Sequence, residues 1–337
     1  MRSEGKMNIY DIAQKAGVSI ATVSRVINGN DKVSAKTRDK VNAVIEEMGY
    51  TPNIFARGLG LNSIKMVGVI CTDVSDIYYA KAVSVLEECL RQNGLDAILC
   101  CVGTEIENKK KSIEMLINKR VDAIILIGSV FKEKDDNSHI KKAAKQLPVI
   151  MINALIREPN VYCVLSDEYQ AMRHMVKKLI QNRTPQILYL YDVDTPSSHS
   201  KLSGFKQGFK ECDRSIDNEL IVKVPHDLNE VYEVVEKLLD KGLQFSSVIA
   251  SEDLLAIGAL KAIRKKEIKI PEDIAVIGFN NSILAECSSP QLTSIDNKVS
   301  TVCSTAVNLL KDVLEEKNVP HIITIETDLF IRETYKL

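Results

Sequence analysis

From residue 66 onward, short apolar runs alternate with stretches of helical periodicity, and this alternation restricts the fold more than any other feature of the chain. Strands that alternate with helices form parallel sheets, because each helix returns the chain to the same end of the sheet. We therefore expect an α/β fold. The expected strands are Val67 to Cys71, Ala97 to Val102, Ala123 to Ile127, Val149 to Ile152, Ile187 to Tyr191, Leu220 to Val224, Val248 to Ala250 and Ile274 to Ile277.

A break in this pattern at residues 161–167 divides the expected strands into two groups. With 337 residues the chain also exceeds what one hydrophobic core usually organises, so two similar lobes are favoured over one large sheet. A closing segment at about 292–326 would return the chain to the first lobe. The core is predicted at 63–337. Lobe one would take about 63–163 and 293–323, and lobe two about 164–292 and 324–337.

Composition removes several classes of protein. No apolar run approaches the roughly 20 residues that span a bilayer, and Met1 to Lys6 contains no apolar signal core, so we expect a cytoplasmic protein without a membrane partner. The eight cysteines and five histidines show no metal-ligand spacing, and we predict no metal. Residues 1–62 carry 9 Lys+Arg against 6 Asp+Glu, a net +3, which is compatible with nucleic-acid binding without establishing it.

The first fifty residues predict three short helices. Asn8, with Asp11 three positions later, can cap a helix that begins at Ile9 and ends at Gly17. Ser19 can cap a second helix from Ile20 to Ile27, and a third would begin behind Ser34 and end near Met48. Two helices separated by so short a turn, with apolar residues where crossed helices would meet, are typical of a helix-turn-helix. A generic three-helix module has the same spacing.

The polar residues of the second helix favour DNA binding over a generic module. Thr22, Ser24 and Arg25 form a short polar face beside the turn, and only Arg offers a planar fork that matches the guanine edge in the major groove. Ile20 and Ala21 are apolar at the exposed start of this helix, where a thymine methyl group would give them a partner.

The segment from Ile9 to Gly29, followed by Val33 to Arg38, resembles the headpiece of the lactose/galactose-repressor family, with an Ile-Ala pair like that of the catabolite-control branch. This resemblance implies a DNA-binding headpiece at residues 1–52. It implies base contacts by Ile20, Ala21 and Arg25. Phosphate contacts are implied for Asn8, Tyr10, Ser19, Thr22, Ser24, Asn28, Ser34 and Thr37.

Residues 53–62 are expected to form a hinge helix that folds only on DNA. Isolated helices shorter than about 12 residues are marginal in water, and two glycines weaken this one further. The resemblance implies that Leu59 enters the minor groove at the operator centre, with Asn53, Ala56 and Arg57 beside it. A plain flexible linker is the alternative.

The sequence does not contain the motifs of the two enzyme classes that such an α/β pattern could suggest. No G-x-G-x-x-G follows an expected strand, so no dinucleotide site is predicted. Ser197 to Ser200 has neither a nucleophile elbow nor a placed acid, and it reads as a polar loop. We predict no catalysis and no cofactor.

Across the remaining chain the pattern resembles the periplasmic-binding-protein-like core of the same family. Ligands of open α/β folds bind beyond the carboxyl ends of strands. The expected effector residues are Asp73, Ser75, Tyr78, Tyr79, Lys201, Glu252, Asp253 and Asn280, with Asp76 beside them. Lys201, Glu252 and Asn280 replace an Arg, an Asn and an Asp of sugar-responsive members, and only Asp253 agrees with them. Because the chain has no Trp, Tyr78, Tyr79 and His226 are the candidates for stacking on a ligand ring.

The sequence thus predicts a homodimeric transcription regulator of carbon-metabolism genes, most simply a repressor. It would bind a pseudo-palindromic operator and an effector such as a sugar or sugar phosphate. Three alternatives stay open: a catabolite-control regulator with a phosphocarrier-protein corepressor, a regulator with a degenerate pocket, and a cytoplasmic solute-binding module. Against the first, Ser84, Ser300 and Asn308 stand where that branch carries Arg or Tyr.

Overall fold

The computed structural model describes residues 8–27, 32–50, 63–182 and 186–336. Internal contacts divide the chain into two units, Met1–Met66 with Arg120–Asp122, and the rest of the chain. Each unit is described by itself. The expected hinge at 53–62 lies outside the described residues.

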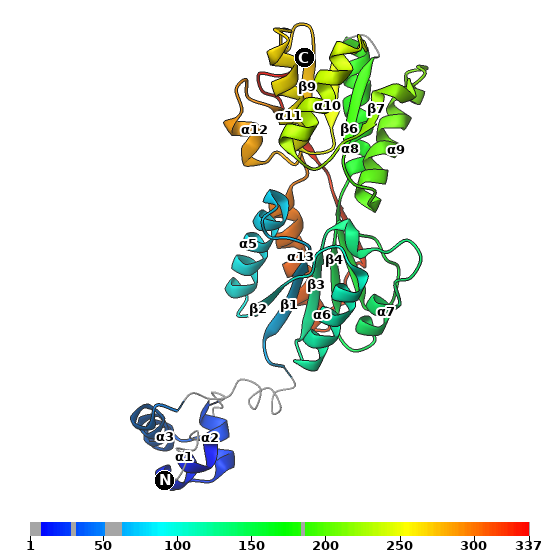
Figure 1. Ribbon diagram of the computed structural model, residues 1–337. Coiled ribbons are helices and arrows are strands. Elements are labelled where there is room, and N and C mark those ends of the chain that lie inside the picture. Colours follow the sequence, from blue (N-terminus) through cyan, green and yellow to red (C-terminus); the bar gives the residue numbers. More distant parts are fainter. Residues whose placement is uncertain (1–7, 28–31, 51–62, 183–185, 337) are drawn as a thin grey trace. The chain divides into compact units, whose positions relative to one another are not determined.

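The first unit is a three-helix headpiece made of α1 (Ile9–Ala16), α2 (Ile20–Ile27) and α3 (Ala35–Met48) (Figure 1). Asn8 and Asp11 form a capping box at the start of α1, as their spacing predicts. Gly17 ends α1 at φ 62°, a left-handed conformation that favours glycine. These caps explain why the eight-residue helix α1, too short to be stable alone, begins and ends where it does.

The headpiece core is a small apolar cluster to which all three helices contribute. The buried side chains are Ile12, Ala13, Ala16, Val23, Val26, Val41 and Val44. The cluster spans the turn between α1 and α2, so the angle between these two helices depends on packing rather than on the turn alone.

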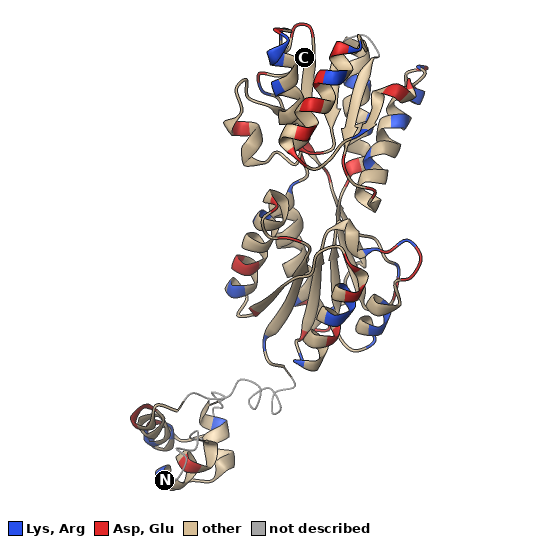
Figure 2. Ribbon diagram, viewed as in Figure 1, with Lys and Arg blue, Asp and Glu red and all other residues tan. Residues whose placement is uncertain are grey.

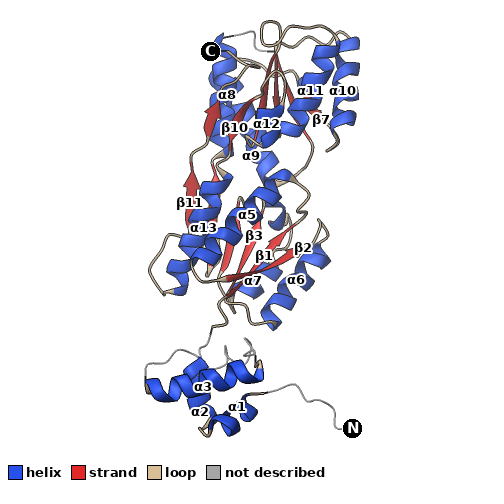
Figure 3. Ribbon diagram, turned by 90° about the vertical axis from the view of Figure 1, so that its left-hand side faces the viewer, coloured by secondary structure: helices blue, strands red, loops and turns tan. Residues whose placement is uncertain are grey.

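The second unit contains two lobes, each with one six-stranded sheet and helices on both faces (Figure 3). In lobe one the strand order is β11-β5-β4-β3-β1-β2. The strands are β1 (Met66–Cys71), β2 (Asp96–Cys101), β3 (Ala123–Ile127), β4 (Val149–Ile152), β5 (Val161–Ser166) and β11 (Ile322–Ile325). The helices are α5 (Ile77–Gln92), α6 (Ile106–Asn118), η1 (Ser129–Phe131), α7 (Ser138–Ala144) and α13 (Val299–Leu314). The main core of this lobe lies where α5 and α13 cover the sheet.

In lobe two the strand order is β12-β10-β9-β8-β6-β7, and β12 is antiparallel to β10. The strands are β6 (Ile187–Tyr191), β7 (Ile221–Lys223), β8 (Ser247–Ala250), β9 (Ala275–Phe279), β10 (Thr293–Asp296) and β12 (Asp328–Phe330). The helices are α8 (Glu168–Asn182), α9 (Pro196–Glu211), η2 (Asn218–Leu220), α10 (Leu228–Asp240), α11 (Asp253–Lys265) and α12 (Ile283–Cys287). One core lies under α8 and α9 and another under α10 and α11.

The surface helices of both lobes carry basic and acidic residues mixed together (Figure 2), as is common for helix faces in contact with water. Among the described residues, none of the helices combines the length and the apolar character that crossing a bilayer requires.

All eight strands expected from the apolar runs are present, but three boundaries between the lobes differ from expectation. Residues 161–166 form β5, a strand of lobe one that follows β4 without an intervening helix, so the alternation gave no signal for it. Thr293–Asp296 was expected in lobe one but pairs with β9 of lobe two. Ile322–Ile325 belongs wholly to lobe one, where it pairs with β5. The last two are short strands whose place depends on pairing with distant segments, which local sequence does not encode.

The chain crosses between the lobes three times. The crossings follow β5, β10 and β11, at about residues 167, 297–298 and 326–327. The Ser166 hydroxyl donates a hydrogen bond to the backbone carbonyl of Asn297, which joins the first two crossings.

Candidate DNA-binding face and effector pocket

The second helix of the headpiece presents the three expected base-reading residues on one side. Successive helix residues are about 100° apart, so Ile20, Ala21 and Arg25 share a face opposite Val23 and Val26. All three are exposed, and Ile20 keeps 41% of its surface accessible, whereas the two valines are buried. The apolar residues Ile20 and Ala21 could pack on a thymine methyl group, and the neighbouring Arg25 could hydrogen-bond a base edge.

The expected phosphate contacts cluster where helices begin. Asn8, Ser19 and Ser34 precede α1, α2 and α3, and each side-chain oxygen accepts a backbone N–H of its own helix. The Ser19 and Thr22 hydroxyls lie 2.9 Å apart, and the Ser34 and Thr37 hydroxyls repeat this spacing. Helix N-termini carry partial positive charge and free N–H groups, which suit them to phosphate.

Of the other expected DNA contacts, Tyr10 is 66% exposed and Ser24 is half-buried. Asn28, Asn53, Ala56, Arg57 and Leu59 lie outside the described residues.

A polar cavity of about 420 Å³ lies between the two lobes of the core. Seven of the eight expected effector residues line it, namely Asp73, Ser75, Tyr78, Tyr79, Lys201, Glu252 and Asn280. Residues that follow strands of both sheets meet here, as expected for ligand sites at the carboxyl ends of parallel strands. The volume matches a small molecule rather than a macromolecule.

Asp253, the eighth expected residue, does not line this cavity. Its side chain is buried and accepts hydrogen bonds from the backbone N–H and hydroxyl of Ser282, at 2.6 and 2.7 Å, and from the Ser294 hydroxyl at 2.6 Å. Burial raises the Asp253 pKa, although these donors oppose the rise. In this structure Asp253 therefore fastens the loop after β9 to β10, and both of its oxygens are engaged by serines.

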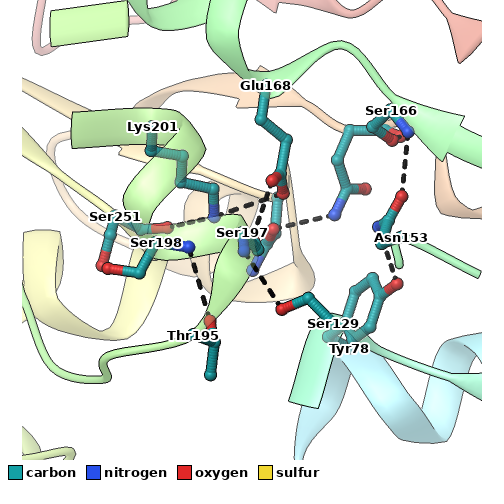
Figure 4. A network of polar contacts seen from close by, with 12 residues as sticks. Tyr78, Ser129, Asn153, Ser166, Glu168, Thr195, Ser197, Ser198, Lys201 and Ser251 are labelled. Carbon is teal, nitrogen blue, oxygen red and sulfur yellow. Dashed lines mark hydrogen bonds and ion pairs between the residues drawn. The ribbon is translucent and has the colours of Figure 1, made fainter. Parts of the chain in front are cut away.

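Lys201 lies in the wall of the cavity and is almost fully buried. Its Nζ is 3.6 Å from the Glu168 carboxylate and donates to the Ser251 carbonyl at 3.0 Å (Figure 4). The same Nζ lies 4.0 Å from the centre of the Phe279 ring. The side chains of Lys201 and Glu168 are only 6% and 7% exposed. This pair joins α9 to the start of α8, so the lysine positions the wall rather than offering a free cation.

Ser197 and Ser198, expected in a polar loop, instead form the first turn of α9, capped by Thr195. A proline at the first helical position explains the error, because it favours a helix start that the serine-rich sequence obscures. The Ser197 hydroxyl donates to Glu168 at 2.6 Å, and its backbone N–H donates to the Ser129 hydroxyl of lobe one at 3.2 Å (Figure 4). The first turn of α9 thus contacts both lobes.

On the lobe-one side of the cavity, Asn153 connects two elements. Its Nδ2 donates to the Tyr78 hydroxyl at 2.9 Å, and its Oδ1 accepts the backbone N–H of Ser166 at 2.8 Å (Figure 4). Asn153 has φ 55°, a conformation that asparagine tolerates better than most residues. Tyr78 is thereby tied to the first crossing between the lobes.

A second polar cluster surrounds His226. Its Nδ1 lies 2.6 Å from Asp192 and 3.9 Å from Glu252, and its Nε2 lies 3.8 Å from Asp76 of lobe one. The hydrogen bond to Asp192 raises the His226 pKa to about 9. Burial pushes the Asp192 pKa upward, but the hydrogen bond and charge of His226 outweigh it and leave the value below its usual range.

Asp76, His226 and Glu252 bring potential ligand atoms within 4.8 Å of one another, a grouping that sequence spacing did not reveal. A metal would have to displace the imidazole proton, and the raised His226 pKa opposes that loss. The absence of a metal therefore remains our prediction, and His226 itself supplies the positive charge between the carboxylates.

Stability of the core should fall as the pH rises from about 6.5 to 9. The His226 pKa is about 9 when folded against an ordinary 6.5, so its contribution is complete below 6.5 and lost as the pH passes 9. Burial raises the Glu252 pKa from 4.5 to about 7, which acts in the same direction but mainly between pH 4.5 and 7. Thermal unfolding midpoints of the wild type and His226→Gln, measured across this range, should show a shallower decline in the variant. Equal slopes would contradict the assignment.

Sequence reasoning missed several cavity residues, including Ser129, Asn153, Glu168, Asp192, Ser251 and Asn297. Glu168 and Asp192 each follow a strand end, and that position was the signal that could have found them. Ser129 and Asn153 reach the cavity through a 3-10 turn and a left-handed backbone, for which the sequence offers no periodic pattern.

Comparison with known proteins agrees with both units. Residues 8–53 match the family described as bacterial regulatory proteins, lacI family, and residues 64–333 match periplasmic binding proteins and the sugar-binding domain of the LacI family. An HTH-type transcriptional regulator of Lachnoclostridium phytofermentans is 47% identical over 330 residues, covering 97% of this chain and 99% of that protein.

Two solved structures have the same fold over nearly the whole chain. A lac repressor dimer bound to operator and an anti-inducer superposes with a TM-score of 0.87 at 23% identity, covering 97% of this chain and 98% of that one. The transcriptional regulator CelR in complex with cellobiose gives 0.71 at 25% identity, covering 98% and 100%.

These matches, together with the geometry of the two units, define the class: the protein is a DNA-binding transcriptional regulator, and the relatives it matches are regulators rather than enzymes. It belongs to the LacI family of bacterial regulatory proteins. The resemblance and the fold expected from the sequence are both confirmed.

Proposed function

We propose that the protein acts in the cytoplasm as a homodimer, binds a pseudo-palindromic operator and represses genes of carbon metabolism. The observation that carries this proposal is the exposed face of α2, where Ile20, Ala21 and Arg25 lie together beside capped helix N-termini. Two such helices in a dimer can enter successive major grooves, which is why paired half-sites are expected.

Replacing Arg25 by Ala should weaken operator binding by about 1–3 kcal/mol and relax the base preference at one position of each half-site. The reason is that a guanidinium can make two hydrogen bonds to a guanine edge, and Ala makes none. Selection of operators from a random pool, followed by titration of the preferred sites, measures both effects.

Thr37→Val is the matched control, because Thr37 is assigned to a phosphate. It should lower affinity similarly for all sequences and leave base preference intact. If Arg25→Ala behaved like Thr37→Val, the base-reading role of Arg25 would be wrong.

For the effector we propose an uncharged sugar rather than a sugar phosphate. Five carboxylates line the cavity, from Asp73, Asp76, Glu168, Asp192 and Glu252. Its two basic lining residues are already engaged, since Lys201 pairs with Glu168 and His226 pairs with Asp192. A phosphate would therefore meet net negative charge without a free cation among the lining residues, whereas hydroxyl groups can donate to carboxylates. The cellobiose complex of CelR supports a sugar as the ligand class.

A thermal-shift screen of the full chain tests this choice, because a ligand that binds only the folded state raises the unfolding temperature. The panel pairs neutral mono- and disaccharides with their phosphorylated forms. We expect a neutral sugar to raise the midpoint and its phosphate to have little effect. Stabilisation by phosphorylated sugars alone would contradict the proposal.

A further inference from the structure

Two cysteines lie side by side at the end of the lobe-one sheet nearest the cavity. Cys71 is the last residue of β1 and Cys101 is the last residue of β2, and their sulfur atoms are 3.9 Å apart. Neither sulfur takes part in a disulfide in this structure. Neither residue lines the cavity or takes part in the DNA-binding face.

The backbone holds these two residues opposite each other. The Val102 N–H donates to the Cys71 carbonyl at 3.1 Å, and the Gly103 N–H donates to the Thr72 carbonyl at 3.0 Å. In a parallel ladder a carbonyl accepts from the residue after its partner, so Cys71 pairs directly with Cys101. Paired residues point to the same face, and neighbouring strands lie about 4.8 Å apart, within the roughly 4.4–6.8 Å between Cα atoms that a disulfide requires.

The two thiols differ in accessibility. Cys71 is buried in the core beneath α5 and α13, and burial raises its pKa to about 12, so it stays protonated at neutral pH. In the single chain Cys101 is exposed, because β2 is the edge strand of the sheet. An oxidant can therefore reach Cys101 first, with a second sulfur already in place behind it.

We propose that Cys71 and Cys101 form a reversible redox pair, which a hydroperoxide converts into a disulfide between β1 and β2. A pair with one accessible and one protected thiol is the arrangement in which the second sulfur resolves the oxidised form of the first.

The chemistry needs only the two side chains and the peroxide. The Cys101 thiolate attacks one peroxide oxygen, the O–O bond breaks, and the other oxygen leaves as water after taking a proton, so that Cys101 becomes a sulfenic acid. The Cys71 sulfur then attacks the Cys101 sulfur, the S–S bond forms, the S–O bond breaks, and the hydroxyl leaves as water with the Cys71 proton. Two thiols and one hydrogen peroxide become one disulfide and two waters.

The Cys71–Cys101 disulfide would change the shape of the cavity through the backbone. The effect on regulation rests on the proposed function of the cavity as the effector site. Thr72 and Asp73 follow Cys71 directly, Thr104 lies three residues after Cys101, and all three line the cavity. Closing the sulfur separation from 3.9 Å to about 2.0 Å must draw the two strand ends together or rotate their side chains. We expect the segment from Thr72 to Tyr79 to respond.

The test uses the full-length chain, reduced and then exposed to increasing hydrogen peroxide, with free thiols blocked in denaturant before digestion. Mass spectrometry should show a peptide pair linked through Cys71 and Cys101 as the main oxidised product, and dithiothreitol should remove it. Cys101→Ser, at an exposed position, should abolish the linked pair and leave Cys71 reduced. Cys287→Ser is the matched control, since Cys287 is also exposed, and it should leave the linkage unchanged.

Three results would overturn the pair: a disulfide between Cys100 and Cys101, a link between two chains through Cys101, or over-oxidised Cys101 with Cys71 still reduced. Hydrogen exchange of the oxidised and reduced chains then tests the link to the cavity. We expect exchange of residues 72–79 to change by severalfold in the wild type and not in Cys101→Ser. A disulfide that formed without this change would refute the link while leaving the sugar-binding proposal intact.

Discussion

Lys201→Met should lower the free energy of unfolding of the core by about 3–5 kcal/mol, because removing one partner of a buried ion pair leaves the other charge uncompensated. The charge left without a partner would be the Glu168 carboxylate, whose side chain is 7% exposed. Among the described residues it would retain only the Ser197 hydroxyl as a hydrogen-bond donor. The loss of the contact between Lys201 and the Phe279 ring adds to the effect. Urea unfolding followed by circular dichroism measures it.

Two further variants make this result specific. The double variant Lys201→Met with Glu168→Gln should recover part of the loss, because no buried charge is then left unpaired. Lys317→Met removes a lysine that pairs with Asp312 at 2.8 Å on the exposed surface, and it should change stability little. Similar losses in Lys201→Met and Lys317→Met would show that burial of the pair is unimportant.

Gly204→Ala should destabilise the core by about 2 kcal/mol and disturb the cavity, despite the better helix propensity of alanine. A Cβ atom at this position would lie 2.2 Å from the Tyr169 carbonyl oxygen, a backbone atom of α8 that cannot rotate away. Overpacking typically costs about 1–3 kcal/mol or more, against a propensity gain of about 1 kcal/mol, so the clash dominates. To relieve it α9 must shift, and α9 carries Ser197 and Lys201.

Ser203→Ala supplies the comparison for this variant, because Ser203 is the exposed neighbour of Gly204 on the same helix. Ser203→Ala should leave the free energy of unfolding unchanged or raise it slightly. Equilibrium urea unfolding gives both stabilities, and the sugar-induced thermal shift gives the state of the cavity. A Gly204→Ala chain as stable as the wild type would mean that α8 and α9 separate at little energetic cost.

The sequence predicted most of the fold because the elements that define it carry strong local signals. The three headpiece helices have caps at Asn8, Ser19 and Ser34, and the eight expected strands are short apolar runs of the right length. The strand that was missed, β5, follows β4 without a helix, and β10 is a polar strand. For both, pairing with a distant strand rather than local pattern decides the structure.

The sequence predicted several of the cavity residues from their position after an expected strand. Asp73, Ser75, Lys201 and Glu252 were found because parallel strands bring their carboxyl ends together. The role of each cavity residue was not predictable, because it depends on the side chains that hydrogen-bond or pair with it in the folded chain. Asp253 agrees with the family pattern yet has both oxygens engaged by serines. The assignments of individual residues to DNA and effector remain predictions for the experiments above.

The three backbone crossings give the core a mechanical property. A joint fastened along three segments, two of them linked through Ser166 and Asn297, can bend but resists twisting and sliding. Lobe two is then left with essentially one way to move against lobe one. Compounds bound in the proposed effector cavity would then differ mainly in how far they close the two lobes on each other.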